Sequence, residues 1–218
     1  MKNQSIIALL LFLLLTTFVS QKKINFTHFN LEKIIIENNL LIKEKDIQKL
    51  FETVYGKNLI FLDNQEIEKA LIQNSFIETF KIKKIYPNTL KIEIFEKKPI
   101  AVLLNKKKKF YLSEKIELID FIELKNYQRL PYVFGNEDEF RIFYNNLKKI
   151  NFPFHLIKKY TLYNSQRWDL ETTNNKIIKL PPKDYIKNID NYIKLIKKKE
   201  FQKYNVFDYR INNQLILK

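Results

Sequence analysis

The stretch KIYPNTLKIEIFEKKPIA, residues 84–101, decides how the first half of this chain folds. Within it, Pro87-Asn88-Thr89 predicts a turn, because proline presets φ and asparagine tolerates a left-handed conformation. From Leu90 to Ile94 apolar and charged side chains alternate, which is the two-residue period of a strand with one buried face. Pro99 lacks a backbone donor and is expected to stop the ladder. The stretch therefore predicts a β-hairpin that ends at a domain edge.

The sequence around this hairpin predicts a small α+β domain. Upstream, residues 29–37 are rich in β-branched side chains and favour a strand. Apolar residues at helical spacing come next, and Asp63 with Glu66 forms a capping box before the second helix, whereas Lys43 is a poor cap for the first. The expected order is a strand at 29–37, helices at about 44–55 and about 64–74, and strands at about 77–86 and about 89–96.

Past Pro99 the sequence predicts a second domain made mostly of strands. Short runs of alternating residues are separated by turn residues, and two longer stretches show helical spacing instead. Strands are expected at about 100–104, 110–112, 117–121, 158–163, 167–172, 176–180 and 205–217, and helices at about 137–150 and 183–198. The class is therefore α+β: a β-α-α-β-β domain, then a mostly antiparallel β domain with two flanking helices.

Composition excludes several classes of protein. The chain has 218 residues, of which 45% are hydrophobic, enough for a buried core and too many for a disordered chain. Two glycines and no cysteine exclude a glycine-rich phosphate loop, disulfides, iron–sulfur clusters and a thiol nucleophile. The net charge of +15 alone would favour nucleic-acid binding, but the lysines are spread along the chain without a zinc-finger or RRM motif. We therefore expect no nucleic-acid partner.

An apolar segment from Ile6 to Val19 is expected to direct the rest of the chain out of the cytoplasm, as a cleaved signal peptide or as an uncleaved anchor. At ~1.5 Å per residue it spans about 21 Å, short of a ~30 Å bilayer core, so its length favours the signal peptide unless flanking Lys22 and Lys23 snorkel. The end of the apolar segment favours the anchor, because Phe18 stands where cleavage after Ser20 would need a small residue.

We expect the anchor. Residues 1–5 would then form a short cytoplasmic tail, residues 6–20 a transmembrane signal anchor, and the rest an exported domain. The anchor residues include Ile6, Leu10, Leu14 and Val19. The lysines just after the segment oppose this orientation under the positive-inside rule, but a very short N-terminal tail before a long domain usually lets that domain translocate.

Residues 84–101 also resemble a family signature. Their Lys-x-x-Pro-x-Thr-Leu…Glu-Lys-x-Pro-x-Ala order is similar to the Arg-x-x-Pro-x-Thr-Leu…Glu-Arg-x-Pro-x-Ala motif that closes the POTRA domain in the FtsQ/DivIB family of bacterial division proteins. Lys84 and Lys97 stand at the arginine positions. Further along, Leu130–Gly135 resembles the family's Leu-Pro-x-Val-x-Gly element. Trp168-Asp169-Leu170 followed by Asn174-Asn175 resembles its Trp-x-Leu strand and Asn-Gly hairpin.

The end of the chain resembles the last strand of the same family, where many members carry Asp-x-Arg-Tyr followed by glycine. Asp208 and Arg210 match this pattern, whereas Ile211 stands at the tyrosine position and no glycine follows. The resemblance runs in order over residues 26–217. It implies a POTRA domain at 26–97 and a C-terminal β domain at 98–218.

The residues suggest no active site. His28 and His155 are far apart in sequence, and a lone histidine among apolar residues is more often structural than a metal ligand. The acidic run at 137–139 fits the first turn of a helix, where the helix dipole favours carboxylates. No serine lies in a glycine-containing elbow. We therefore assign no catalytic, metal-ligating or cofactor-binding residue, and do not expect an enzyme.

The resemblance implies a non-enzymatic scaffold of the bacterial inner membrane, located at the division septum with its C-terminal domain in the periplasm. It implies FtsB and FtsL as partners, with a link to the septal synthase pair FtsW and FtsI. An incoming strand would complete the ladder at the last strand of the chain. The residues expected at this interface are Asp208, Arg210, Ile211, Asn212 and Asn213. Arg210 would pair with a partner carboxylate, and Ile211 would make an apolar contact. The alternative for Asp208 and Arg210 is an ion pair with each other, because residues two apart on a strand lie on the same face.

Two other classes of function remain open at this point. A POTRA-bearing transport or assembly component would dock outer-membrane substrates, but the sequence has one such domain and helices in its second half. A periplasmic enzyme, such as a wall hydrolase, would need the active site that the residues do not suggest. An anchored scaffold should fractionate with membranes, which separates the scaffold from a soluble hydrolase.

Overall fold

The computed structural model describes residues 2–17, 26–106 and 108–218. Its first helix, α1 (Lys2–Thr17), has 16 residues. This helix overlaps the expected anchor at 6–20, of which residues 18–20, including Val19, lie outside the described part. Among the described helices, none combines the length and the apolar character needed to cross a membrane.

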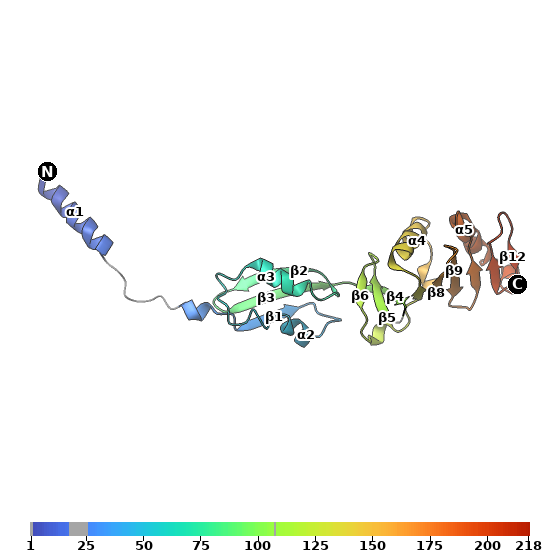
Figure 1. Cartoon of the computed structure of the whole chain (residues 1–218), viewed down its shortest axis with the longest axis horizontal. Coiled ribbons are helices and arrows are strands. Elements are labelled where there is room, and N and C mark those ends of the chain that lie inside the picture. Colours follow the sequence, from blue (N-terminus) through green and yellow to red (C-terminus); the bar gives the residue numbers. More distant parts are fainter. Residues whose placement is uncertain (1, 18–25, 107) are drawn as a thin grey trace.

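The first folded domain is a three-stranded sheet with two short helices (Figure 1). Its elements are η1 (Phe26–Phe29), β1 (Lys33–Glu37), α2 (Glu44–Lys49), α3 (Asn64–Leu71), β2 (Ile77–Ile85) and β3 (Thr89–Glu96). The spatial order of the strands is β1-β3-β2, with β1 parallel and β2 antiparallel to β3. The expected β-α-α-β-β order is therefore confirmed.

Alternation along the hairpin decides which face of this sheet is buried. Leu90, Ile92 and Ile94 are fully buried, while the residues between them are half-buried. Asp63 accepts a hydrogen bond from the Gln65 backbone and caps α3, as expected. The first helix is shorter than expected: α2 begins without a side-chain cap and gives way to turns after Lys49. The first strand is also shorter, because a 3₁₀ turn occupies residues 26–29.

The second domain is one continuous nine-stranded sheet in the described residues. Its strands are β4 (Pro99–Asn105), β5 (Lys108–Ser113), β6 (Leu118–Asp120), β7 (Tyr132–Phe134), β8 (Ile157–Leu162), β9 (Trp168–Thr172), β10 (Ile177–Lys179), β11 (Val206–Asp208) and β12 (Ile216–Leu217). Their spatial order is β12-β11-β10-β9-β8-β7-β4-β5-β6. The helices are α4 (Glu137–Lys149), α5 (Tyr185–Leu195), η2 (Lys125–Tyr127), η3 (Phe154–Leu156) and η4 (Lys199–Phe201).

Most strand pairings in this sheet are antiparallel, as expected, but three pairings in the described residues are parallel. Strand β7 is parallel to both β4 and β8, and β10 is parallel to β11. The two long helices account for two of these pairings: α4 connects β7 to β8 and α5 connects β10 to β11, and a helical crossover brings its two strands back in parallel. Strand β7 comes to lie parallel to β4 after the chain has passed through β5, β6 and η2. The remaining pairings in the sheet are antiparallel.

Two expectations at the ends of this domain were wrong. The strand expected at 205–217 is two short strands, β11 and β12, separated by a turn. Asn213 adopts a left-handed φ of 57° in this turn, which a continuous strand would not allow. Pro99 does not stop a ladder but opens β4, since the first residue of a strand tolerates a missing donor.

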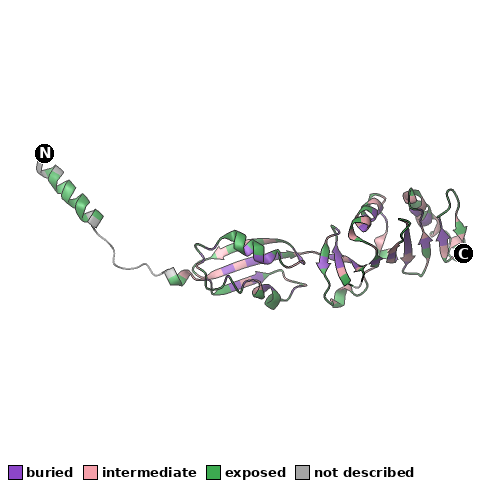
Figure 2. Cartoon of the chain, in the orientation of Figure 1, coloured by how far each residue is buried: buried purple, intermediate pink, exposed green. Residues whose placement is uncertain are grey.

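An aromatic cluster fills the space between the sheet and its helices. Figure 2 colours the buried segments of these strands and helices purple. The Phe143 ring of α4 stacks on Trp168 of β9 with centroids 4.9 Å apart, and Phe140 meets Tyr160 edge-on. Gly135 leaves room for the Trp168 ring, because a Cβ at this position would lie 3.2 Å from it. Both helices thus pack their apolar residues against this cluster, whereas Val102, Tyr111 and Ile119 on β4 to β6 are buried in the core that includes the first domain.

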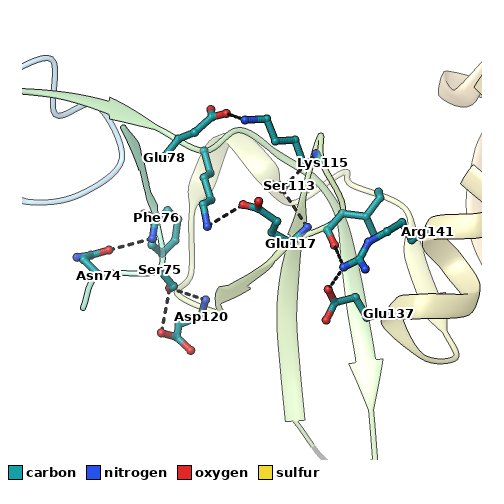
Figure 3. A network of polar contacts seen from close by, with 12 residues as sticks. Asn74, Ser75, Phe76, Glu78, Ser113, Lys115, Glu117, Asp120, Glu137 and Arg141 are labelled. Carbon is teal, nitrogen blue, oxygen red and sulfur yellow. Dashed lines mark hydrogen bonds and ion pairs between the residues drawn. The ribbon is translucent and has the colours of Figure 1, made fainter. Parts of the chain in front are cut away.

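The two domains join through a hydrophobic contact edged by polar contacts (Figure 3). Phe76 of the first domain meets the Tyr111 ring of β5 edge-on, with centroids 6.5 Å apart. Beside them, the Ser75 hydroxyl donates to the Asp120 carboxylate at 2.9 Å and accepts from its backbone N–H at 2.9 Å. Asp120 ends β6, the outermost strand on this side, so the first domain covers the end of this edge strand.

Two ion pairs cross the same junction. Lys97 Nζ lies 2.9 Å from a Glu117 carboxylate oxygen, and Lys115 pairs with Glu78. The hydrogen bond from Lys97 holds the pKa of Glu117 below its ordinary value. Lys97 therefore helps to hold the two domains together.

We expect Glu117→Gln to lower the free energy of unfolding by about 0.5 kcal/mol at pH 7, since the pair is partly exposed. A carboxyl with a lowered folded-state pKa adds stability above its unfolded pKa and loses it as pH falls through the folded value. The difference from the unchanged chain should therefore vanish in acid, which urea unfolding at several pH values measures. Glu114→Gln is the control, because its contact with Lys98 is 3.8 Å long and exposed; an equal effect there would contradict the assignment.

Candidate partner-binding edge

Strand β12 ends the large sheet on the side away from the first domain (Figure 1). The backbone N–H groups of Val206 and Lys218 each donate to the other residue's carbonyl, at 2.9 and 3.1 Å. In an antiparallel pair such residues alternate with pairs whose backbone groups point apart. The next pair is Phe207 with Leu217, so the N–H and C=O of Leu217 face outward from the sheet. In the described residues, β12 has β11 as its sole neighbour.

Asp208 and Arg210 form a forked ion pair where β11 ends. Arg210 Nη2 lies 2.7 Å from Asp208 Oδ2, and Nε lies 2.8 Å from Oδ1, which also accepts from the Arg210 backbone at 3.1 Å. The Asp208 side chain is 8% exposed and that of Arg210 is 43% exposed. The hydrogen bonds from Arg210 lower the pKa of Asp208, and the carboxylate raises the pKa of the guanidinium. Arg210 therefore neutralises a buried carboxylate of its own chain.

A second pair of the same kind lies beside it on β9, and the sequence reasoning missed it. Arg167 Nε lies 3.3 Å from Asp169 Oδ1, and the guanidinium lies over the Tyr163 ring, 4.2 Å from its centroid. Burial raises the pKa of Asp169 against the opposing pull of Arg167. Lys179 of β10 stands in register between Asp169 and Asp208. The signal available in the sequence was an Arg-x-Asp next to a strand, the mirror of Asp-x-Arg at 208–210.

The turn between β11 and β12 carries the other expected site residues. Ile211 is 50% exposed, although large apolar side chains usually lie inside, and Asn212 and Asn213 are exposed beside it. A hollow of about 460 Å³ separates this turn from the start of α5, where Lys183 and Lys187 line it. The structure thus brings these residues together at one end of the sheet.

Tyr209 fixes this turn to the body of the domain. Its ring is buried, and its hydroxyl lies 2.9 Å from Oδ1 of Asn191 on α5. Burial raises the pKa of Tyr209, so the hydroxyl stays neutral. Tyr209 therefore belongs to the core of the second domain. The neighbouring residues Asp208, Arg210 and Ile211 are therefore attached to a residue that is fixed in the core.

No metal site accompanies this edge. Within the described ranges, no three histidine, aspartate or glutamate side chains gather closely enough to hold a metal ion. His28 lies in η1 of the first domain, and His155 lies in η3 of the second. The chemistry that this edge offers is backbone pairing together with charge and apolar contact.

The comparison with protein families and the comparison with curated proteins agree with each other. The family model for the POTRA domain of the FtsQ type matches residues 29–97. Two curated relatives, each named Cell division protein FtsQ, come from Rickettsia conorii and Rickettsia felis. Each is 29% identical to this chain over 194 residues, which is 85% of this chain and 71% of the relative. A third, from Rhizobium meliloti, bears the same name and is 22% identical over 158 residues, 72% of this chain and 51% of the relative.

Removing the guanidinium should cost stability only while Asp208 is charged. We expect Arg210→Ala to lower the free energy of unfolding by about 1 kcal/mol at pH 7, because it leaves a nearly buried carboxylate with fewer donors. In an Asp208→Asn background the same change should cost a few tenths of that, which a double-mutant cycle measures. Because the folded pKa of Asp208 is lowered, the coupling should be present above its unfolded pKa and disappear as pH falls through the folded value. Equal costs in both backgrounds would contradict the pairing.

Proposed function

This chain belongs to the FtsQ family of cell division proteins, and from that premise we propose that it is a non-enzymatic scaffold of the divisome. In this proposal it binds FtsB and FtsL through its C-terminal edge, and so connects early and late division proteins at the septum. The observation that carries the proposal is the outward-facing backbone of β12, at the end of the large sheet away from the first domain.

The binding mode we propose is addition of a partner strand to β12. An extended segment would pair with the free N–H and C=O of Leu217, and affinity would come mainly from these backbone bonds. An unpaired sheet edge readily accepts such a strand, and proteins usually blunt edges that have no partner. Short length is one way to blunt an edge, and β12 has two residues, so side-chain contacts beside it must supply the rest.

Those contacts would come from the turn at 211–213 and from Arg210. The three nitrogens of the Arg210 guanidinium carry five N–H donors in all. Of these nitrogens, Nε and Nη2 donate to Asp208. The remaining donors of the half-exposed Arg210 are available for a partner carboxylate. Ile211 would fill the place of an apolar anchor. Asn212 and Asn213 would supply adaptable hydrogen bonds at the rim.

We further propose that the N-terminal segment holds the chain at the inner membrane, with the folded domains in the periplasm. The apolar run of α1 supports this, since Ile6, Leu10 and Leu14 are all more than half exposed. Such exposure in water would be unfavourable, and a lipid or protein surface would relieve it. The first domain would provide a separate docking surface for other division proteins.

The sharpest test removes β12 alone. Ending the chain after Gln214 deletes the edge strand but keeps Phe207, which is fully buried in the core; a longer deletion would remove it. We expect the shortened chain to bind the periplasmic part of FtsB at least about tenfold more weakly than the full chain. Isothermal titration calorimetry of both chains in neutral detergent measures this.

The control is the far edge of the sheet, where Asp120→Asn alters β6 without touching β12. This variant should bind FtsB as the full chain does. Circular dichroism should show that both variants remain folded. Undiminished affinity of a folded chain without β12 would contradict the strand-addition proposal, and no binding by the full chain would remove FtsB as a partner.

A further inference from the structure

A groove lies near the middle of the molecule, on a part of the second domain that the proposed FtsB edge does not use. It has a volume of about 420 Å³ and is bounded by the start of β4, the segment at 129–131, helix α4 and residues 154–158. Strand β8, which contributes Tyr160 to it, is separated from β12 by three strands. At about 4.8 Å per strand the two places are about 19 Å apart.

Aromatic rings form the floor of this groove. Phe140 and Tyr160 are fully buried beneath it, and the Tyr144 and Phe154 rings lie against each other with centroids 4.3 Å apart. Ala101 also lines the groove, and its short side chain takes up little of the space. A floor of this kind favours an apolar or aromatic anchor, since such a group loses its contact with water there.

The rim of the groove is basic. Its charged and ionisable lining residues are Lys98, Arg129, His155 and Lys158, with no carboxylate among them. The high lysine content of the chain does not explain this, because the cleft between the domains is lined by Asp46, Asp120 and Glu123 as well as Lys43. The hollow beside the 211–213 turn likewise contains Asp184.

The basic residues of this rim differ in the ion pairs that they make with the rest of the chain. Arg129 is exposed and makes no ion pair with any residue that the structure describes. Lys98 has one exposed contact with Glu114 at 3.8 Å, whereas Lys158 is held by Glu171 at 2.9 Å. Arg129 is therefore available to bind an anion, and the long, exposed contact of Lys98 leaves it partly available. Arginine binds carboxylates with a planar fork of donors.

We propose that this groove binds a protein segment in which acidic side chains flank one aromatic or large aliphatic anchor. The anchor occupies the aromatic floor, and the acidic residues pair with Arg129 and Lys98. A volume of about 420 Å³ suits a few side chains of a peptide, and a flat lipid surface does not reach a concave floor. The groove and the proposed FtsB edge are separate sites, so a result against one proposal does not bear on the other.

The test uses the full chain in neutral detergent and a fluorescein-labelled peptide with two glutamates on each side of one phenylalanine. Two reference peptides replace the phenylalanine by serine or the glutamates by lysines. Fluorescence polarisation at about 0.1 M salt should show the acidic phenylalanine peptide binding at least about fivefold more tightly than either reference. Arg129→Glu should weaken this binding at least about fivefold.

Lys125→Glu is the matched control, because it makes the same charge change on an exposed residue of η2 that does not line the groove. It should leave binding unchanged, and all variants should melt at the same temperature. Equal binding of the three peptides, or equal effects of the two substitutions, would overturn the proposal. Vesicles of anionic phospholipid are the last arm: binding that depends on Arg129 there, without peptide binding, would assign the groove to lipid instead and also overturn it.

Discussion

Backbone hydrogen bonding across one nine-stranded sheet determines where this molecule can bind a strand of another protein. A sheet has two edges, and each edge exposes unpaired groups. At one edge, the Ser75 hydroxyl of the first domain bonds the outward N–H of Asp120 at the end of β6. At the other edge, the described residues place nothing beyond β12. The first domain therefore covers the end of one edge strand, whereas the C-terminal edge has no neighbour among the described residues.

The same sheet explains how charge is arranged at that edge. Asp169, Lys179 and Asp208 follow one another across three neighbouring strands, and Arg167 and Arg210 flank this row. Each arginine already has a carboxylate partner in its own chain. Binding at the edge therefore does not need an unpaired buried charge in the free protein, which would cost stability. A partner carboxylate would meet donors whose positions are already fixed, which reduces the entropy lost on binding.

How far the sequence predicted this structure depended on the range of the interactions involved. The hairpin at 84–101 could be predicted almost to the residue, because alternation and a proline turn are local signals; β3 occupies the expected 89–96. The continuous strand expected at 205–217 was wrong, because its apolar residues suit a strand while the left-handed Asn213 breaks it. The position of Asp208 and Arg210 at the end of the sheet was expected, and so was the possibility of a surface ion pair between them. The burial of Asp208 and the forked geometry of the pair could not be predicted, since they depend on β11 ending at Asp208. Arg167 escaped notice because its nearness to this site arises from strand pairing between distant segments.

Amide hydrogen exchange at Leu217 tests the central claim most directly. The outward N–H of this residue should exchange slowly once the periplasmic part of FtsB is bound to the full chain, because a partner carbonyl then accepts it. The amide of Lys218, which donates to Val206 in the free chain, should change far less and serves as the internal reference. Protection that appears at Leu217 on binding is the predicted result. Saturating FtsB with unchanged exchange at Leu217 would contradict strand addition at β12.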